Sequence, residues 1–429
     1  MLEQVFIVNI HYPEIADEQF VMQQEEMQSL VETAGGEVVA KIIQKRERPD
    51  AKWRVGQGKV NEIKRVCEQL DAELVIFYDQ LSPSQNRNLQ EAIGVAVIDR
   101  VQLILDIFAL RATSKEGKLQ VALAQNQYLL PRLQGLGNVL SRLGGGIGTR
   151  GPGETQLEQD RRLLRKQIQQ IKQDLAKVSQ ERALTRQKRR NSHLFQVGLF
   201  GYTNAGKSTL INGLAAAETY EQDELFATLT PLTRTYTLPN QFEIALTDTV
   251  GFIQDLPPMV IDAFHSTLEE SQDVDLLLIV IDASSPYRDR QKEVVMSVIE
   301  KLGMQSLPHL FVYNKCDLID TTQLGIFEDE NTLLLSAYDG DDLTRLNRRI
   351  VDKIKTIYVP VHSFVKGEDI NGWLKQANRY YIEAMPFDEI NDGYQIEAYL
   401  PVADYERYYA ERRAIDALEV AEAHIAETD

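Results

Sequence analysis

Residues 201–208 read Gly-Tyr-Thr-Asn-Ala-Gly-Lys-Ser and directly follow an apolar run. This is the G-x-x-x-x-G-K-[ST] pattern of a phosphate-binding loop, which connects a strand to a helix. Gly201 and Gly206 would let backbone N–H groups approach phosphate oxygens with no Cβ in the way. Lys207 would place its charge on the terminal phosphates, and the Ser208 hydroxyl would bind Mg²⁺. The loop therefore predicts a nucleotide-binding protein rather than a glycine-rich turn without a ligand.

Three further motifs, each after an apolar run, indicate that the nucleotide carries guanine. Residues 248–251 read D-T-V-G, so that Asp248 would hold Mg²⁺ through water and the Gly251 amide would contact the γ-phosphate. Residues 314–317 read N-K-C-D, and the last carboxylate can accept two hydrogen bonds from guanine that adenine does not offer. The asparagine and lysine would brace the loop and the base. The S-A pair at residues 336–337 would read the guanine O6 through its backbone.

Residues 226–231, F-A-T-L-T-P, lie between the phosphate loop and the D-T-V-G motif and predict a switch loop. We expect the Thr228 hydroxyl to bind Mg²⁺ only when the γ-phosphate is present, with Thr230, Thr233 and Thr235 as alternatives. The predicted catalytic residues are Lys207, Thr228 and Gly251. The predicted GTP contacts are Gly201, Tyr202, Thr203, Asn204, Ala205, Gly206, Lys207, Ser208, Thr209, Phe226, Ala227, Thr228, Leu229, Thr230, Asp248, Thr249, Val250, Gly251, Asn314, Lys315, Cys316, Asp317, Ser336, Ala337 and Tyr338.

Two residues of the predicted site refine the mechanism. Phe252 follows Gly251 where Ras-type proteins carry a glutamine that orients water, and a phenylalanine side chain cannot hydrogen-bond water. We therefore expect slow intrinsic hydrolysis that uses another group, a backbone atom or a partner. Asn204 occupies the position at which potassium-dependent GTPases carry asparagine, so it predicts either a K⁺ ligand or a side chain that stabilises the loop by a hydrogen bond.

The charge of the chain is unevenly distributed. The 429 residues carry a net charge of −18, yet residues 111–194 contain 17 Lys or Arg and 6 Asp or Glu, a net charge of +11. The same stretch has eight glycines between residues 135 and 156. A basic element of this kind favours contact with a polyanion over a merely solvated helical face. Arg142, Arg150, Arg161 and Arg162 are the predicted RNA contacts.

The apolar pattern predicts a multidomain α/β protein. Residues 1–110 alternate strands and helices, which indicates a small α/β domain with a mostly parallel sheet. Residues 111–194 predict a helical hairpin with a glycine-rich tip, residues 195–357 a Ras-like G domain, and residues 358–429 an acidic C-terminal domain. In the last, residues 361–365 and 394–400 predict strands, and residues 371–383 and 405–415 predict helices.

The remaining composition excludes several classes of protein. No apolar run is long enough to span a bilayer, and the first residues lack the basic region of a signal peptide. Two cysteines supply neither a disulfide framework nor a zinc quartet. We therefore expect a cytoplasmic protein, and we expect it to be monomeric.

The segments GYTNAGKSTL, FATLTPLTR and DTVGFI, together with RLGGGIGTRGPGETQLEQDRR at residues 142–162, resemble the HflX family of translation-associated GTPases. The resemblance extends over essentially the whole chain. It implies a factor that binds the large ribosomal subunit and splits stalled or idle ribosomes, with the hairpin tip entering ribosomal RNA near the peptidyl-transferase centre. Thr230 is a departure, because the family more often has Asp there. The resemblance also implies ATP use by the N-terminal domain, which the sequence leaves open because its only full phosphate-loop motif is residues 201–208.

Two other functions compete with this one. The chain would also suit a GTP-dependent regulatory switch that binds a protein effector through the helical hairpin. An ATP-driven RNA remodeller is disfavoured by Asp317, which selects guanine.

Overall fold

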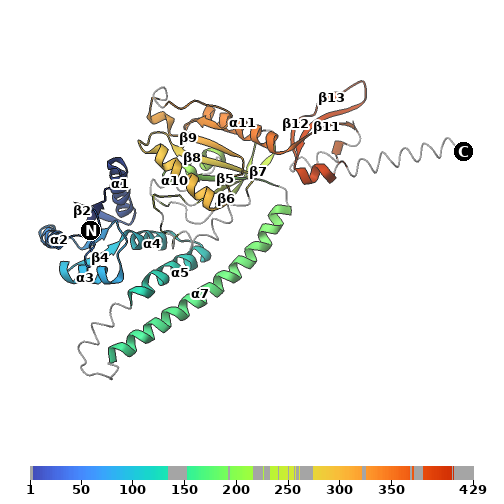
Figure 1. Cartoon of the computed structure of the whole chain (residues 1–429). Helices are drawn as coiled ribbons and strands as arrows, with labels where there is room; N and C mark the ends of the chain where they lie inside the picture. Colours follow the sequence, from blue (N-terminus) through green and yellow to red (C-terminus); the bar gives the residue numbers. More distant parts are fainter. Residues whose placement is uncertain are drawn as a thin grey trace.

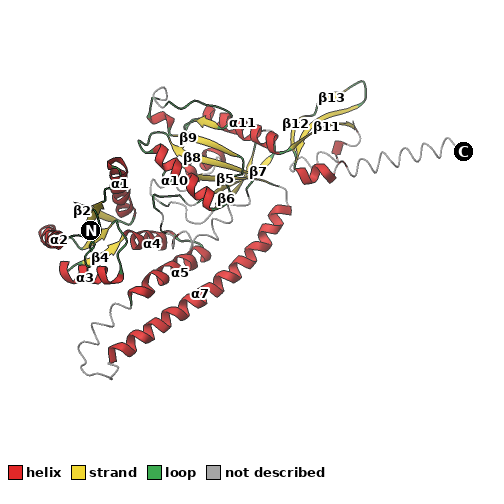
Figure 2. Ribbon diagram, viewed as in Figure 1, coloured by secondary structure: helices red, strands yellow, loops and turns green. Residues whose placement is uncertain are grey.

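Three β-sheets organise the chain in the computed structural model (Figures 1 and 2). The expected multidomain α/β fold is confirmed. No helix among the described residues is long and apolar enough to cross a membrane. The structure describes residues 3–133, 152–191, 194–215, 226, 232–239, 241–249, 251–255, 257, 260, 274–320, 325–367, 370–371, 380–407 and 409.

The first sheet has the strand order β2-β1-β3-β4, and all of its neighbouring strands are parallel. Alternate residues of β1 point to opposite faces of the sheet, so that Val5 and Ile7 pack against α1 and α4 while Phe6 and Val8 pack against α2 and α3. The mostly parallel sheet expected for this region is confirmed. Its elements are β1 (Glu3–His11), α1 (Asp17–Thr33), β2 (Gly36–Lys45), α2 (Gln57–Leu70), β3 (Leu74–Phe77), α3 (Pro83–Ile93), β4 (Ala96–Asp99) and α4 (Arg100–Arg111).

Two helices, α5 (Lys115–Arg132) and α7 (Pro152–Asn191), pack along each other as the predicted hairpin (Figure 1). An ion pair attaches α5 to the first sheet. The Arg132 guanidinium of α5 contacts the buried Asp99 carboxylate at the end of β4, at 3.0 Å. Asp99 also accepts a hydrogen bond from the Leu81 amide, so the sheet and α5 share one buried carboxylate. The predicted tip lies outside the described residues.

The second sheet has the order β10-β9-β8-β5-β7-β6, and only β6 is antiparallel to its neighbour. The helices α8 and α11 cover one face, and α10 covers the other. The carboxyl ends of β5, β7, β8 and β9 therefore meet at one edge, which is where the predicted motifs begin. The elements are β5 (Phe195–Gly201), α8 (Lys207–Ala215), β6 (Leu232–Thr237), β7 (Glu243–Asp248), β8 (Leu276–Asp282), α10 (Arg288–Lys301), β9 (His309–Asn314), β10 (Thr332–Leu334) and α11 (Gly340–Ile357).

The third sheet is antiparallel, with β14 (Gly393–Leu400) between β11 (Val359–Lys366) and β12 (Tyr381–Ala384), and with β13 (Phe387–Asp388) also paired to β14. The helix predicted over residues 371–383 is wrong at its end, because residues 381–383 belong to β12. Pairing with β14 overrides the local helical pattern there. Of the helix predicted over residues 405–415, the described residues, 405–407 and 409, are helical, and the helix begins earlier, at residue 402.

Candidate nucleotide-binding site

The phosphate loop connects β5 to α8 and is built around its two glycines. A Cβ on Gly201 would overlap the backbone oxygen of Val280 on the neighbouring strand. Gly206 has a φ of +87°, and a Cβ there would overlap the side-chain amide of Asn314. Both positions therefore require glycine, and the loop lies close to the adjoining strands at the mouth of the sheet.

Lys207 is the first residue of α8 and is only 7% exposed. Its Nζ donates hydrogen bonds to the backbone oxygens of Gly201 at 3.2 Å and Tyr202 at 3.0 Å, so the ammonium group is folded back over its own loop. Burial lowers the pKa of Lys207 to about 8. An anionic ligand at this position would relieve the cost of burying the charge, which is the electrostatic signature of a phosphate site.

Two of the predicted Mg²⁺ ligands meet in the structure. The Ser208 Oγ donates a hydrogen bond to the Asp248 Oδ2 at 2.8 Å, which brings the loop hydroxyl to the end of β7. Hydroxyl and carboxylate oxygens are the donors that Mg²⁺ prefers, so these residues fit the ion. Thr249, the next residue, uses its hydroxyl to bond the Leu199 backbone oxygen at 2.6 Å and therefore secures β7 to β5.

Asn314 joins the base motifs to the phosphate loop. Its Nδ2 donates to the Ala205 oxygen at 3.0 Å, and its Oδ1 accepts from the Ala337 amide at 3.0 Å. A single side chain therefore holds three loops, as the predicted bracing role requires. Cys316 adds a backbone bond to Leu335, which ties the N-K-C-D loop to the S-A loop.

The group predicted to read guanine, the Asp317 carboxylate, is accessible. Asp317 lies in the 3₁₀ turn Cys316–Leu318 and is exposed, as is Tyr338. Lys315 has a left-handed backbone, and its Nζ contacts Asp282 Oδ2 at 2.8 Å. Sequence reasoning missed Asp282, although a carboxylate at the end of the buried strand β8 is a signal that could have found it.

The segment after Gly251 is tied to the phosphate loop by its backbone. The Thr203 amide donates to the Phe252 oxygen at 2.8 Å, and the Phe252 amide donates to the Gly201 oxygen at 3.2 Å. The Phe252 ring is buried and stacks on Phe200. The side chain at this position thus contributes to the core, which agrees with the expectation that it does not orient water.

The N-terminal domain contacts the site through a buried ion pair. Arg100 at the start of α4 bonds Glu26 of α1 at 2.6 Å, and it donates to the backbone oxygen of Gln254. The other Glu26 oxygen accepts from the Gln254 amide at 3.0 Å and from the Tyr202 hydroxyl. Burial raises the pKa of Tyr202, which keeps its hydroxyl protonated as the donor. Sequence reasoning missed Glu26 and Arg100, because nothing local marks a contact between distant segments.

Two predicted GTP contacts turn their side chains towards the protein interior. The Tyr202 side chain points to Glu26, and the Phe226 ring packs edge-on against Phe108 of α4 at 4.6 Å. Only their backbones are left to approach a nucleotide. One apolar core thus extends from the first sheet through both rings to the second sheet.

Asn204 is exposed and has a φ of +59°. Its side chain makes no hydrogen bond with another described residue. Arg161 and Arg162 lie on α7, where both contact Glu158, and Arg162 is the more exposed of the two. The predicted residues outside the described part are Ala227, Thr228, Leu229, Thr230, Val250, Arg142 and Arg150.

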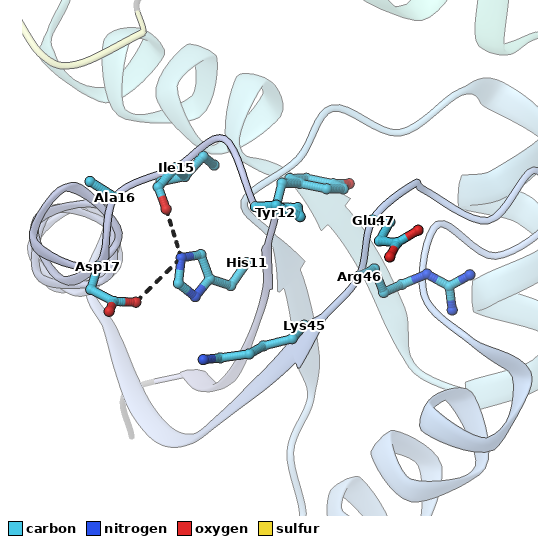
Figure 3. A pocket seen from close by; sticks show the side chains of 9 residues that line it. His11, Tyr12, Ile15, Ala16, Asp17, Lys45, Arg46 and Glu47 are labelled. Atoms are coloured by element: carbon cyan, nitrogen blue, oxygen red, sulfur yellow. Dashed lines mark hydrogen bonds and ion pairs between the residues drawn. The ribbon is translucent and has the colours of Figure 1, made fainter.

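A second hollow, of about 580 Å³, lies at the carboxyl ends of β1 and β2 (Figure 3). In Figure 3 the His11 ring lies between the Ile15 backbone oxygen, at 2.9 Å, and the Asp17 carboxylate, at 3.7 Å. Lys45 and Arg46 line the same hollow. The His11 imidazole already has partners within the N-terminal domain, so this geometry gives His11 a structural role.

Three protein-family models match successive parts of the chain: "GTP-binding GTPase N-terminal" over residues 22–109, "GTP-binding GTPase Middle Region" over residues 111–189 and "50S ribosome-binding GTPase" over residues 196–315. Among solved structures, a GTP-binding protein from Sulfolobus solfataricus in complex with GDP is 25% identical, with a TM-score of 0.44, and the match covers 82% of this chain and 98% of that one.

Curated relatives match over most of their length. "GTPase HflX" of Alkalihalophilus pseudofirmus is 47% identical over 384 residues, which cover 89% of this chain and 90% of that protein. "GTPase HflX" of Escherichia coli is 42% identical over 356 residues, which cover 82% and 83%. With this identity over more than four fifths of both chains, and with the phosphate loop, Asp248 and the N-K-C-D loop assembled at one sheet edge, the protein belongs to the HflX family of GTPases.

Proposed function

We propose that this GTPase binds the large ribosomal subunit and its RNA, dissociates or rescues stalled and idle ribosomes, and leaves after hydrolysing GTP to GDP and phosphate. The observation that carries the proposal is a physical connection between the nucleotide site and the basic hairpin. Arg100 holds the backbone of Gln254 beside the site, and its neighbour Asp99 holds Arg132 of α5. Two consecutive residues therefore join the segment after Gly251 to the helices of the hairpin.

In this proposal the hairpin supplies the affinity for RNA. The region of residues 111–194 has a net charge of +11, and α7 extends about 60 Å at 1.5 Å per residue. A long basic helix that projects from the compact sheets suits a groove lined by phosphates, and such contacts weaken steeply with salt. The net charge of −29 on the rest of the chain limits contact with RNA to this element.

The chemistry follows from the loop geometry. Lys207 would turn its ammonium group from its own loop oxygens to the β- and γ-phosphates, and the Gly251 amide would bond the γ-phosphate from the opposite side. Ser208, Thr228 and, through water, Asp248 would hold Mg²⁺, which neutralises charge on the phosphates. A Cβ at Gly251 would press on Thr203, so the close approach of this backbone depends on glycine. Asp317 would select guanine.

Intrinsic hydrolysis is slow in this proposal, because the Phe252 ring is committed to the core. The ribosome would supply or position the missing group, with K⁺ at the exposed Asn204 as a contributor to charge stabilisation. The protein would act as a monomer in the cytoplasm. GTP would favour the subunit-bound conformation, and hydrolysis would release it.

The test measures binding to purified large subunits together with GTP turnover. We expect the full chain to cosediment with large subunits in a non-hydrolysable GTP analogue and not in GDP, and we expect subunits to stimulate turnover strongly. Replacing Arg142, Arg150, Arg161 and Arg162 by Ala should weaken subunit binding and the stimulation of turnover, and it should reduce the salt dependence of the remaining binding.

Equal turnover with and without subunits would overturn the proposal. Unchanged subunit binding by the four-arginine variant would instead favour the alternative, in which the hairpin docks a protein effector. Monitoring 70S particles separately tests dissociation, because a factor that only binds would leave the 70S fraction unchanged.

A further inference from the structure

The two faces of the C-terminal sheet differ in what covers them among the described residues. Val361, Ile396 and Leu400 are buried on the inner face. On the outer face, Tyr381 packs edge-on against Phe242 of the G domain at 5.9 Å. Farther along, the strands of this sheet extend away from the nucleotide-binding sheet (Figure 1). There the surface forms a hollow of about 720 Å³, lined by residues that include Phe364 and Glu397. The hollow is remote from the nucleotide site and has no part in the chemistry described above.

An aromatic ring forms the floor of this hollow. The Phe364 ring lies against Gly393 on the neighbouring strand, so closely that a Cβ on Gly393 would overlap the ring. The absence of that side chain leaves room for the ring, which is 39% exposed. A cationic side chain can stack on a partly exposed aromatic ring of this kind.

Two carboxylates line the same hollow as the ring. Glu397 lines the hollow opposite His362 in the strand register and makes no ion pair with another described residue. Asp388 lines the rim, and hydrogen bonds from Asn391 hold the pKa of that carboxyl below its usual range. The ring and two acidic groups therefore present the two features that recognise a guanidinium or ammonium group, a π-face and a carboxylate.

The charge of the whole region excludes one class of occupant. Residues 358–429 contain 15 acidic and 6 basic side chains, a net charge of −9, in contrast to +11 on the hairpin. A surface of this sign repels RNA phosphates. An apolar side chain in the turn after Asp388, Ile390 at 94% exposure, indicates a partner that also offers apolar contacts. A basic protein segment satisfies both requirements.

We propose that the outer face of the C-terminal sheet, around Phe364 and Glu397, docks a Lys- or Arg-bearing segment of a protein in the large ribosomal subunit. This inference rests on the proposed ribosome binding and adds a second contact of opposite charge to it. The hairpin meets RNA, and the C-terminal face meets protein. The two contacts together fix the orientation of the factor, because each surface rejects the partner of the other.

The test uses the full chain, purified large subunits and a non-hydrolysable GTP analogue. Glu397→Lys and Phe364→Ala should each weaken subunit binding by about tenfold, since each removes one of the paired recognition features. Glu406→Lys makes the same charge change at an exposed position on the neighbouring helix and should leave the affinity unchanged. A photoreactive residue at the exposed Gln395 should crosslink to a subunit component that protease removes and ribonuclease does not.

The sign of the Glu397→Lys effect separates the alternatives. Tighter binding, or a crosslink that ribonuclease removes, would show that the face meets RNA and would overturn the inference. Equal affinity of Glu397→Lys, Phe364→Ala and the wild type would show that the face is free on the subunit. Failure of the wild type to cosediment at all would overturn the proposed function, and this inference with it.

Discussion

Two loops of this chain place a glycine pair before a lysine at the carboxyl edge of a parallel sheet, and they differ in how the glycines are packed. At residues 56–59, the sequence Gly-Gln-Gly-Lys leads into α2, and Gly56 caps that helix. A Cβ on Gly58 would meet nothing within 4 Å, whereas a Cβ on Gly201 would overlap the neighbouring strand. A phosphate loop is therefore marked by the close approach of its backbone to adjoining strands, and glycine spacing alone does not identify it.

The lysines that follow the two glycine pairs, Lys59 and Lys207, also differ in how closely they are packed. Lys59 is partly exposed and contacts Glu62 one turn along α2 at 2.8 Å. Lys207 is buried and bonds only backbone oxygens of its own loop among the contacts described. Lys207 is thus a buried cation bonded to backbone oxygens, whereas the charge of Lys59 is balanced by a neighbouring carboxylate. The N-terminal edge instead supplies Arg100, which reaches across to support the nucleotide site.

The largest expected effect comes from the Arg100–Glu26 ion pair, because both of its members also bond the Gln254 backbone beside the phosphate loop. Arg100→Ala leaves the Glu26 carboxylate buried without its partner, which should lower the free energy of unfolding by about 3–5 kcal/mol. Lys59→Ala, which breaks the exposed pair with Glu62, should cost at most about 1 kcal/mol. Denaturant unfolding measures both. A loss below about 1 kcal/mol for Arg100→Ala would show that the two edges are stable independently of this contact.

The next effect concerns catalysis. Lys207→Ala removes the charge that would stabilise the transferred phosphate and should reduce GTP turnover by about 10²–10³-fold. Lys59→Ala is the matched control and should leave turnover unchanged, because its ammonium group contacts Glu62 in its own helix. Steady-state GTP hydrolysis with and without large subunits provides the measurement. A comparable loss in both variants would mean that the first loop also serves the reaction.

Sequence patterns predict that the nucleotide motifs lie together, because each motif follows a short buried strand and the strand ends of a parallel sheet meet at one edge. The helix α4 was not predicted, since its residues are buried on nearly every side and show no amphipathic period. Glu26, Arg100 and Asp282 were missed because their partners are distant in sequence. The strand β12 was read as the end of a helix, because only its pairing with β14 distinguishes the two.

Replacing one glycine of each loop by alanine should change the stability of the protein in opposite directions, by smaller amounts. Gly201→Ala introduces a Cβ that must displace the backbone at Val280, so it should destabilise the protein by about 1–3 kcal/mol. Gly58→Ala places a methyl group in open space in the first turn of α2, so it should stabilise the protein by about 0.4–1 kcal/mol. Thermal and denaturant unfolding of the nucleotide-free protein distinguish these outcomes. The same sign for both substitutions would contradict the packing difference.

The smallest effect is a proton taken up with the nucleotide. Without a ligand, the pKa of Lys207 is about 8, below the value of about 10.4 for an unfolded lysine, so stability should rise with pH between these values as the unfolded state binds more protons. Bound phosphates favour the ammonium form and raise this pKa. At pH 8, GTP binding should therefore take up about half a proton, and affinity should fall as the pH rises above 8.

Calorimetry at pH 8 in two buffers with different ionisation enthalpies measures that uptake directly. Lys207→Arg is the matched control, because a guanidinium remains protonated throughout this range and should take up no proton at this site. The difference between the two proteins should shrink towards zero below pH 7, where Lys207 is already charged in the free protein. Equal proton uptake by the two proteins at pH 8 would show that a group other than Lys207 titrates. The buried cation would then no longer distinguish the loop at residues 201–208 from the loop at residues 56–59.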